Sequence, residues 1–166
     1  FIEILKNELR TAKKPLLLLG RGIRVAEVTK EIKKLIDDLN IPVVLSLNGI
    51  DVIPYNNPNR VGFIGSYGNR WANYALGVCD VLLVLGSRLD LRQTGSDIST
   101  FSKGKKVFHV DIDKGELNNR IPTFATLQAD LKKFLQIVTM EEIFPLKVDT
   151  WKCEIKEQKL KKDDTQ

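Results

Sequence analysis

Short, unbroken apolar runs recur along the sequence and are separated by polar turns. They lie at residues 16–19, 43–45, 81–85 and 107–110. A strand with one exposed face would alternate apolar and polar side chains, so these runs predict strands that are covered on both faces. The run at 81–85, between Asp80 and Gly86, is the predicted central strand. Shorter strands are predicted at 61–64 and 124–127.

Between these runs, apolar side chains recur every three or four residues, which is the spacing of one helix face. This spacing predicts helices over 1–12, from Val25 to Leu39 without a break, over 72–79 and from Leu131 to Val138. Asp130 stands where it would cap the last of these helices. A further short helix is predicted at 114–119.

Continuous apolar strands that alternate with helices of this length indicate parallel pairing with crossover helices. The sequence therefore predicts an α/β fold, with a doubly wound parallel sheet of five to six strands and helices on both faces. This is a Rossmann-like dinucleotide-binding topology, in which ligands bind just beyond the carboxyl ends of the strands.

Composition limits the remaining interpretations. A chain of 166 residues, 43% of them hydrophobic, suits one domain. The Lys-rich stretch 141–166 has little periodicity beyond Trp151 and Ile155 and is predicted to be a polar linker.

The net charge of +5 is spread along the chain, so no nucleic-acid partner is predicted. No apolar run is long enough to cross a membrane, so no membrane association is predicted. Cys79 and Cys153 form no close pair, which favours a cytoplasmic protein.

The turn Gly20-Arg21-Gly22 follows a predicted strand and opens a helix. In this context, backbone N–H groups can face a diphosphate. Val25 stands where a third glycine would complete the dinucleotide fingerprint, and no acidic residue follows the second strand to hold a ribose. An ordinary NAD-binding mode is therefore not predicted. Two interpretations stay open, a phosphate-binding turn and a tight turn needed only for packing.

Further polar side chains gather at other predicted strand ends. The loop Gly65-Ser66-Tyr67-Gly68 precedes a helix, and Arg88 with Arg92 forms a candidate phosphate clamp after the central strand. Since the carboxyl ends of parallel strands meet at one sheet edge, these groups predict a site for a phosphate or a dinucleotide.

Other residues favour structural roles. Asp111 and Asp113 are two carboxylates without further ligands, which is typical of a turn at a strand end, so no metal site is predicted. His109 lies inside a predicted strand and Cys79 closes an apolar helix face, so both are predicted in the core. No residue set predicts catalysis by this chain.

Several motifs then occur in an order shared with a known family. They are Lys14-Pro15 leading into Leu-Leu-Leu-Leu-Gly-Arg-Gly, Ile41-Pro42-Val43-Val44, Gly65-x-Tyr-Gly-x-x-x-Ala-Asn-Tyr-Ala, Cys79-Asp80 with the later Leu-Gly-Ser-Arg-Leu-Asp-x-Arg-x-Thr-Gly, and Val110-Asp111-Ile112-Asp113. Together they resemble the central domain of thiamine-diphosphate enzymes of the acetolactate synthase type. The likeness extends over about residues 1–140.

The resemblance implies a nucleotide site that holds FAD in some members, ADP in others, and is vacant in many. Carried onto this chain, the expected contacts are Gly20, Gly22, Leu47, Asn48, Gly49, Tyr67, Gly68, Gly86, Arg88, Arg92, Asp111, Asp113 and Asp130. FAD-binding synthases commonly have Met-His-Gly where this chain has Ser66-Tyr67-Gly68. FAD, ADP and a vacant site therefore all stay open.

The resemblance also implies a middle domain at 1–140, between a pyrimidine-binding and a diphosphate-binding domain of the same subunit. The linker at 141–166 would lead to the missing C-terminal domain. Thiamine diphosphate and magnesium are expected only in the full-length enzyme, which would be a homodimer or tetramer acting on 2-keto acids. The alternatives are a free-standing dinucleotide-binding or flavoprotein module and a spacer domain.

Overall fold

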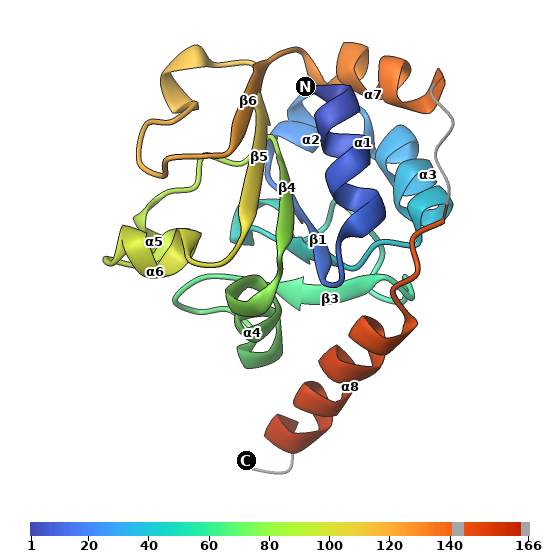
Figure 1. The fold of residues 1–166 in the computed structure, drawn as a ribbon, viewed down its shortest axis with the longest axis vertical. Helices are drawn as coiled ribbons and strands as arrows, with labels where there is room; N and C mark the ends of the chain where they lie inside the picture. Colours follow the sequence, from blue (N-terminus) through green and yellow to red (C-terminus); the bar gives the residue numbers. More distant parts are fainter. Residues whose placement is uncertain (141–144, 164–166) are drawn as a thin grey trace.

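A parallel sheet of six strands forms the centre of the described chain in a computed structural model, which describes residues 1–140 and 145–163 (Figure 1). The strands are β1 (Pro15–Leu19), β2 (Val43–Leu45), β3 (Arg60–Phe63), β4 (Val81–Leu85), β5 (Lys106–Asp111) and β6 (Ala125–Gln128). Their order is β3-β2-β1-β4-β5-β6, and every neighbouring pair is parallel. This confirms the predicted doubly wound α/β fold, with β1 and β4 at its centre.

Helices cover both faces of this sheet. They are α1 (Ile2–Thr11), α2 (Gly22–Val25), α3 (Thr29–Leu39), α4 (Arg70–Val78), α5 (Leu91–Thr94), α6 (Ile98–Ser102), α7 (Leu131–Met140) and α8 (Asp149–Asp163), with 3-10 turns η1 (Leu47–Gly49) and η2 (Lys114–Glu116). Apolar side chains of α1, α3 and α7 pack on one face, and those of α4, α6 and α8 pack on the other.

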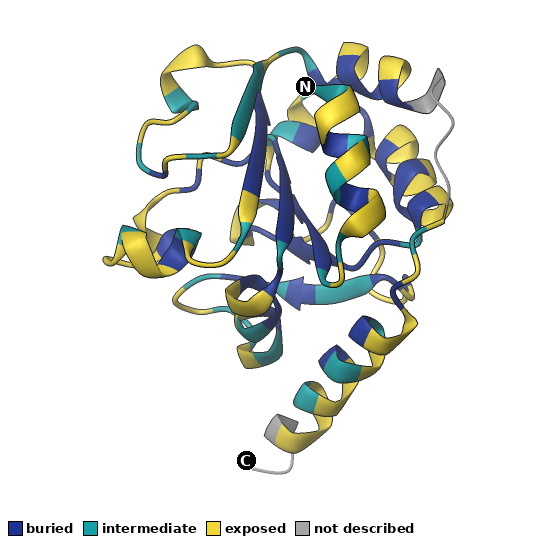
Figure 2. Cartoon of the chain, in the orientation of Figure 1, coloured by how far each residue is buried: buried dark blue, intermediate teal, exposed yellow. Residues whose placement is uncertain are grey.

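The central strand shows why a strand that is covered on both faces needs an unbroken apolar run. Leu83 belongs to the core under α1, α3 and α7, whereas Leu82 and Val84 belong to the core under α4 and α8. All of β4 is buried, as Figure 2 shows for the strands at the centre of the molecule. Successive side chains therefore enter opposite cores, and neither face of β4 contacts water.

The predicted continuous helix from Val25 to Leu39 is wrong. Glu27 has a φ of 57°, in the left-handed region, and this breaks the segment into α2 and α3. Val25 is consequently 70% exposed rather than part of the apolar face. The helix predicted at 114–119 is also shorter than expected, because only the 3-10 turn Lys114–Glu116 forms there.

The segment predicted as a polar linker contains a regular element. Residues 149–163 form α8, and Val148, Trp151 and Ile155 are buried against the core of the α4 face. The indole Nε1 of Trp151 donates to the carbonyl of Pro15 at 3.1 Å. In Figure 1, α8 lies beside α4 and then extends away from the sheet, and the last turns of α8 lie at the opposite end of the molecule from the N-terminus. Residues 141–144 and 164–166 of the predicted linker lie outside the described residues.

Candidate functional site

The strand order determines where a ligand crevice would form. The chain leaves β1 for α3 on one face of the sheet and leaves β4 for α6 on the other. Because these neighbouring strands feed opposite faces, the turns after them flank the topological switch point, where doubly wound sheets bind ligands. The two turns begin with Gly20 and Gly86.

Backbone atoms fill the space between these two turns. The N–H of Gly22 donates to the Gly86 carbonyl at 3.0 Å, and the N–H of Gly20 donates to the Leu85 carbonyl at 3.0 Å. A Cβ at Gly20 would overlap the Gly86 carbonyl, and one at Gly22 would lie 2.7 Å from the Gly86 Cα. These contacts favour the packing interpretation of Gly20 and Gly22 that the sequence left open.

Two other predicted glycines also pack against backbone. A Cβ at Gly49 would lie 3.1 Å from the Gly20 carbonyl carbon, so η1 lies directly against the first turn. A Cβ at Gly68 would lie 2.6 Å from the Phe63 carbonyl oxygen. Both glycines therefore set how closely the loops at the carboxyl edge approach one another.

The loop after β4 is held by a hydrogen bond to His109, the single histidine of the sequence, on the neighbouring strand β5. The ring Nε2 of His109 lies 2.7 Å from the Ser87 carbonyl, and the Ser87 hydroxyl donates to Gln93 Oε1 at 2.6 Å. Burial lowers the pKa of His109, so the ring stays neutral and its Nε2–H donates. The prediction of a core histidine with a satisfied hydrogen bond is confirmed. Leu89, two residues after Ser87, has a φ of 54°, in the left-handed region, and the backbone turns there before α5 begins.

The two arginines of the predicted clamp have different surroundings. Arg88 Nε donates to Glu116 Oε1 at 2.6 Å, which directs its side chain toward η2. Arg92 is exposed, and no hydrogen bond or ion pair of its guanidinium occurs within the described chain. Its backbone N–H is bound by the Asp90 carboxylate, which caps α5. Arg92 is therefore the freer of the two cations for an added anion.

A shallow groove of about 80 Å³ brings Arg92 together with other predicted residues. It is lined by residues 46–48 after β2, residues 63–67 around the end of β3, and Asp90, Arg92 and Gln93 after β4. The backbone N–H groups of Leu47, Asn48 and Tyr67 make no hydrogen bond within the described residues. These are unused donors beside a guanidinium, which is the chemistry that an anionic group requires.

The predicted acidic residues lie at the other end of the same edge. Asp111 Oδ1 accepts from the Asp113 N–H at 2.9 Å, and Asp113 Oδ1 accepts from the Gly115 N–H at 2.8 Å. Asp130 Oδ1 accepts from the N–H groups of Lys132 and Lys133, which confirms the predicted cap of α7. In the parts of the chain that the structure describes, no three His, Cys, Asp or Glu side chains are grouped as metal ligands.

One further cation at this edge was missed by the sequence analysis. Arg21 is exposed in the turn after β1, and neither its guanidinium nor its backbone N–H makes a hydrogen bond within the described residues. Its position between Gly20 and Gly22 was a usable signal, because a residue between two packed glycines at a strand end must point outward.

Comparison with known proteins identifies the family. Residues 2–138 match the model of the thiamine pyrophosphate enzyme central domain. The chain belongs to this family. Similar proteins include the probable acetolactate synthase large subunit of Methanococcus aeolicus, at 37% identity over 128 residues, which are 77% of this chain and 21% of that protein. Acetolactate synthase isozyme 2 large subunit of Escherichia coli K12 is 31% identical over 134 residues, covering 81% of this chain and 24% of that protein.

A third relative extends the likeness toward the C-terminal part of this central domain. Acetolactate synthase 1, chloroplastic, of Nicotiana tabacum is 30% identical over 155 residues, covering 90% of this chain and 23% of that protein. The chain thus spans less than a quarter of the length of each of these relatives. No helix in the described residues is long and apolar enough to cross a membrane.

Proposed function

We propose that this central domain holds the adenosine diphosphate part of a nucleotide, as FAD or ADP, at the carboxyl edge of its sheet. The observation that carries the proposal is the groove after β2, β3 and β4, where the Arg92 guanidinium lies beside unused backbone donors. A diphosphate needs such donors and cations at close range. We propose a position beside the β1–β4 crevice rather than in it, because backbone atoms of Gly20, Gly22 and Gly86 fill that crevice.

Each part of the nucleotide has a candidate partner in this chain. Arg92, with the N–H groups of Leu47 and Asn48, would hold the diphosphate. Arg21 does not line the groove, but it is exposed in the turn that packs against η1 and would add a second cation. Tyr67 is 79% exposed and lines the groove, so its ring would offer a flat face for a base or flavin ring. At the far end of the edge, the carboxylates of Asp111 and Asp113 would accept hydrogen bonds from hydroxyl groups.

The parent protein would be a thiamine-diphosphate-dependent enzyme of the acetolactate synthase type, acting on 2-keto acids. Its flanking pyrimidine-binding and diphosphate-binding domains would hold thiamine diphosphate and magnesium, and the subunits would assemble as a homodimer or tetramer. Relatives that are four to five times longer than the matched segment support the presence of such further domains. A cytoplasmic location is supported by Cys79 and Cys153, which are both free thiols.

A nucleotide titration tests the binding proposal against a spacer with a vacant site. FAD fluorescence quenching and thermal shifts with ADP should both report saturable binding to the 166-residue chain, because a ligand of the folded state raises its melting temperature. Arg92→Ala should weaken binding by about 1.5–3 kcal/mol, which is roughly 10- to 150-fold. Arg88→Ala should weaken it less, because Glu116 already engages that guanidinium.

Arg10→Ala is the matched control, because Arg10 is also an exposed arginine and lies near the end of α1, away from the carboxyl edge. It should leave nucleotide affinity unchanged. If neither nucleotide binds the wild-type chain or the full-length enzyme, the spacer interpretation is correct. Binding that Arg92→Ala and Arg10→Ala weaken equally would place the nucleotide elsewhere.

A further inference from the structure

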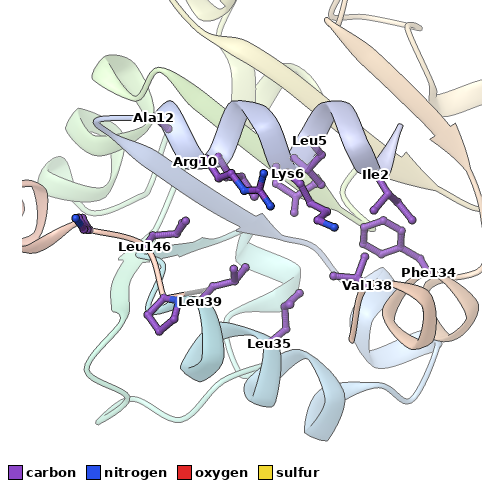
Figure 3. A pocket seen from close by; sticks show the side chains of 14 residues that line it. Ile2, Leu5, Lys6, Arg10, Ala12, Leu35, Leu39, Phe134, Val138 and Leu146 are labelled. Atoms are coloured by element: carbon purple, nitrogen blue, oxygen red, sulfur yellow. The ribbon is translucent and has the colours of Figure 1, made fainter. Parts of the chain in front are cut away.

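A second cavity lies on the face of the sheet covered by α1, α3 and α7, away from the carboxyl edge. It has a volume of about 290 Å³, and Leu83 at the middle of β4 is one of its lining residues. Leu35 and Leu39 of α3 form one side, and Phe134 and Val138 of α7 close one end (Figure 3). The cavity therefore reaches from the surface of the helix layer to the central strand.

The interior of this cavity is apolar. Leu5, Leu9, Leu35, Leu39 and Phe134 are all buried residues of the core on this face, and all contribute to its wall. The apolar side chains that line an empty cavity have no atoms opposite them and so lose dispersion contacts. Cavities with apolar walls therefore take up apolar guests readily. The volume is at the lower end of the roughly 300–1,000 Å³ that is typical of ligand pockets, so one short tail fits better than a two-tailed lipid.

The rim of the cavity is positively charged. Lys6 and Arg10 of α1, together with Lys147, line it, and no acidic side chain is among its described lining residues. Figure 3 shows the Lys6 and Arg10 side chains extending from α1 over the opening. Arg10 and Lys147 are exposed and form no ion pair within residues 1–140 and 145–163. The Lys6 ammonium lies 3.5 Å from Glu3 Oε1, so its charge is already partly balanced, and Arg10 and Lys147 are the rim cations that an added anion would meet.

We propose that this cavity binds a single-tailed anionic amphiphile, with a medium-chain carboxylate as its simplest form. The tail would lie between α1 and α3 against Leu83, and the carboxylate would lie at the rim between Arg10 and Lys147. Binding is non-covalent and does not involve the carboxyl edge of the sheet. The inference is thus independent of the proposed nucleotide site.

Calorimetric titration of the 166-residue chain with a series of fatty acids tests the proposal. Octanoate should bind saturably, and affinity should rise about fourfold for each methylene from hexanoate to octanoate, because each buried CH₂ contributes about 0.8 kcal/mol. The gain should stop once the tail fills the cavity. Octylamine should bind at least tenfold more weakly than octanoate, because its ammonium would meet the cationic rim.

Variants of the wall and the rim locate the site. Ala12→Phe adds bulk at the cavity wall without emptying the core, and it should abolish octanoate binding while its melting temperature stays near that of wild type. The double change Arg10→Gln with Lys147→Gln should weaken octanoate binding at least tenfold and leave octanol binding unchanged. Arg92→Gln, at the other edge, is the control and should bind octanoate normally.

Three results would overturn the proposal. One is the absence of saturable heat with octanoate up to about 5 mM, because any remaining binding would be too weak to count as a site. Another is unchanged binding in a folded Ala12→Phe protein, which would place the ligand elsewhere. The third is equal affinity for octanoate and octylamine, which would remove the role of the basic rim. Should Ala12→Phe fail to fold, the charge variants still decide the outcome.

Discussion

Trp151 offers the most direct test of how the C-terminal helix is attached. Its side chain is only 2% exposed, and its indole Nε1 donates to the Pro15 carbonyl at the start of β1. The ammonium of Lys14 lies 5.2 Å from its ring centroid and 2.7 Å from Glu154 on the same helix. One side chain thus joins α8 to the first strand through burial, a hydrogen bond and a neighbouring cation.

Trp151→Ala removes the buried ring and its hydrogen bond, and leaves the ion pair between Lys14 and Glu154 in place. Truncating a buried aromatic residue costs about 3–5 kcal/mol through lost burial and the cavity that remains. Trp151→Phe keeps a ring but leaves the Pro15 carbonyl without its donor, so a smaller loss of about 1–3 kcal/mol is expected. Against a typical domain stability of about 5–15 kcal/mol, the alanine variant should be markedly destabilised.

Urea denaturation followed by circular dichroism measures both losses without depending on the removed fluorophore. Leu160→Ala is the control on the same helix, since Leu160 is 66% exposed, and its cost should stay within about 0.5 kcal/mol. A loss below about 1 kcal/mol for Trp151→Ala, with an unchanged m-value, would refute the docking of α8. The linker interpretation would then be correct for this segment.

Two further predictions concern the core. Leu83→Ala should cost about 2–5 kcal/mol in the same denaturation assay, because it removes a buried side chain from the central strand and enlarges the cavity beneath α1. A loss below about 0.5 kcal/mol would contradict the burial of Leu83 in the core. Burial raises the pKa of the Cys79 thiol to about 11, so at pH 8 a thiol reagent should modify exposed Cys153 quickly and Cys79 only after unfolding. Equal rates for the two thiols in folded protein would show that Cys79 is accessible.

Local patterns determined the elements of this fold. Burial on both faces demands a continuous apolar run, and for this reason the central strand could be predicted at residues 81–85, where the structure has β4. The cap of α7 by Asp130 was equally predictable, because it joins groups that are two and three residues apart. The grouping of Leu47, Tyr67 and Arg92 in one groove followed from the rule that parallel strands end at the same edge.

Only the tertiary structure decided contacts between segments far apart in the chain. The packing of Gly22 on Gly86 and the pairing of Arg88 with Glu116 depend on which strands are neighbours, which no local pattern records. The attachment of α8 is of the same kind, because Trp151 finds its hydrogen-bond acceptor 136 residues earlier in the chain. Periodicity reports which side chains share a face of one element, whereas the partner of that face is selected by the packing of the whole domain.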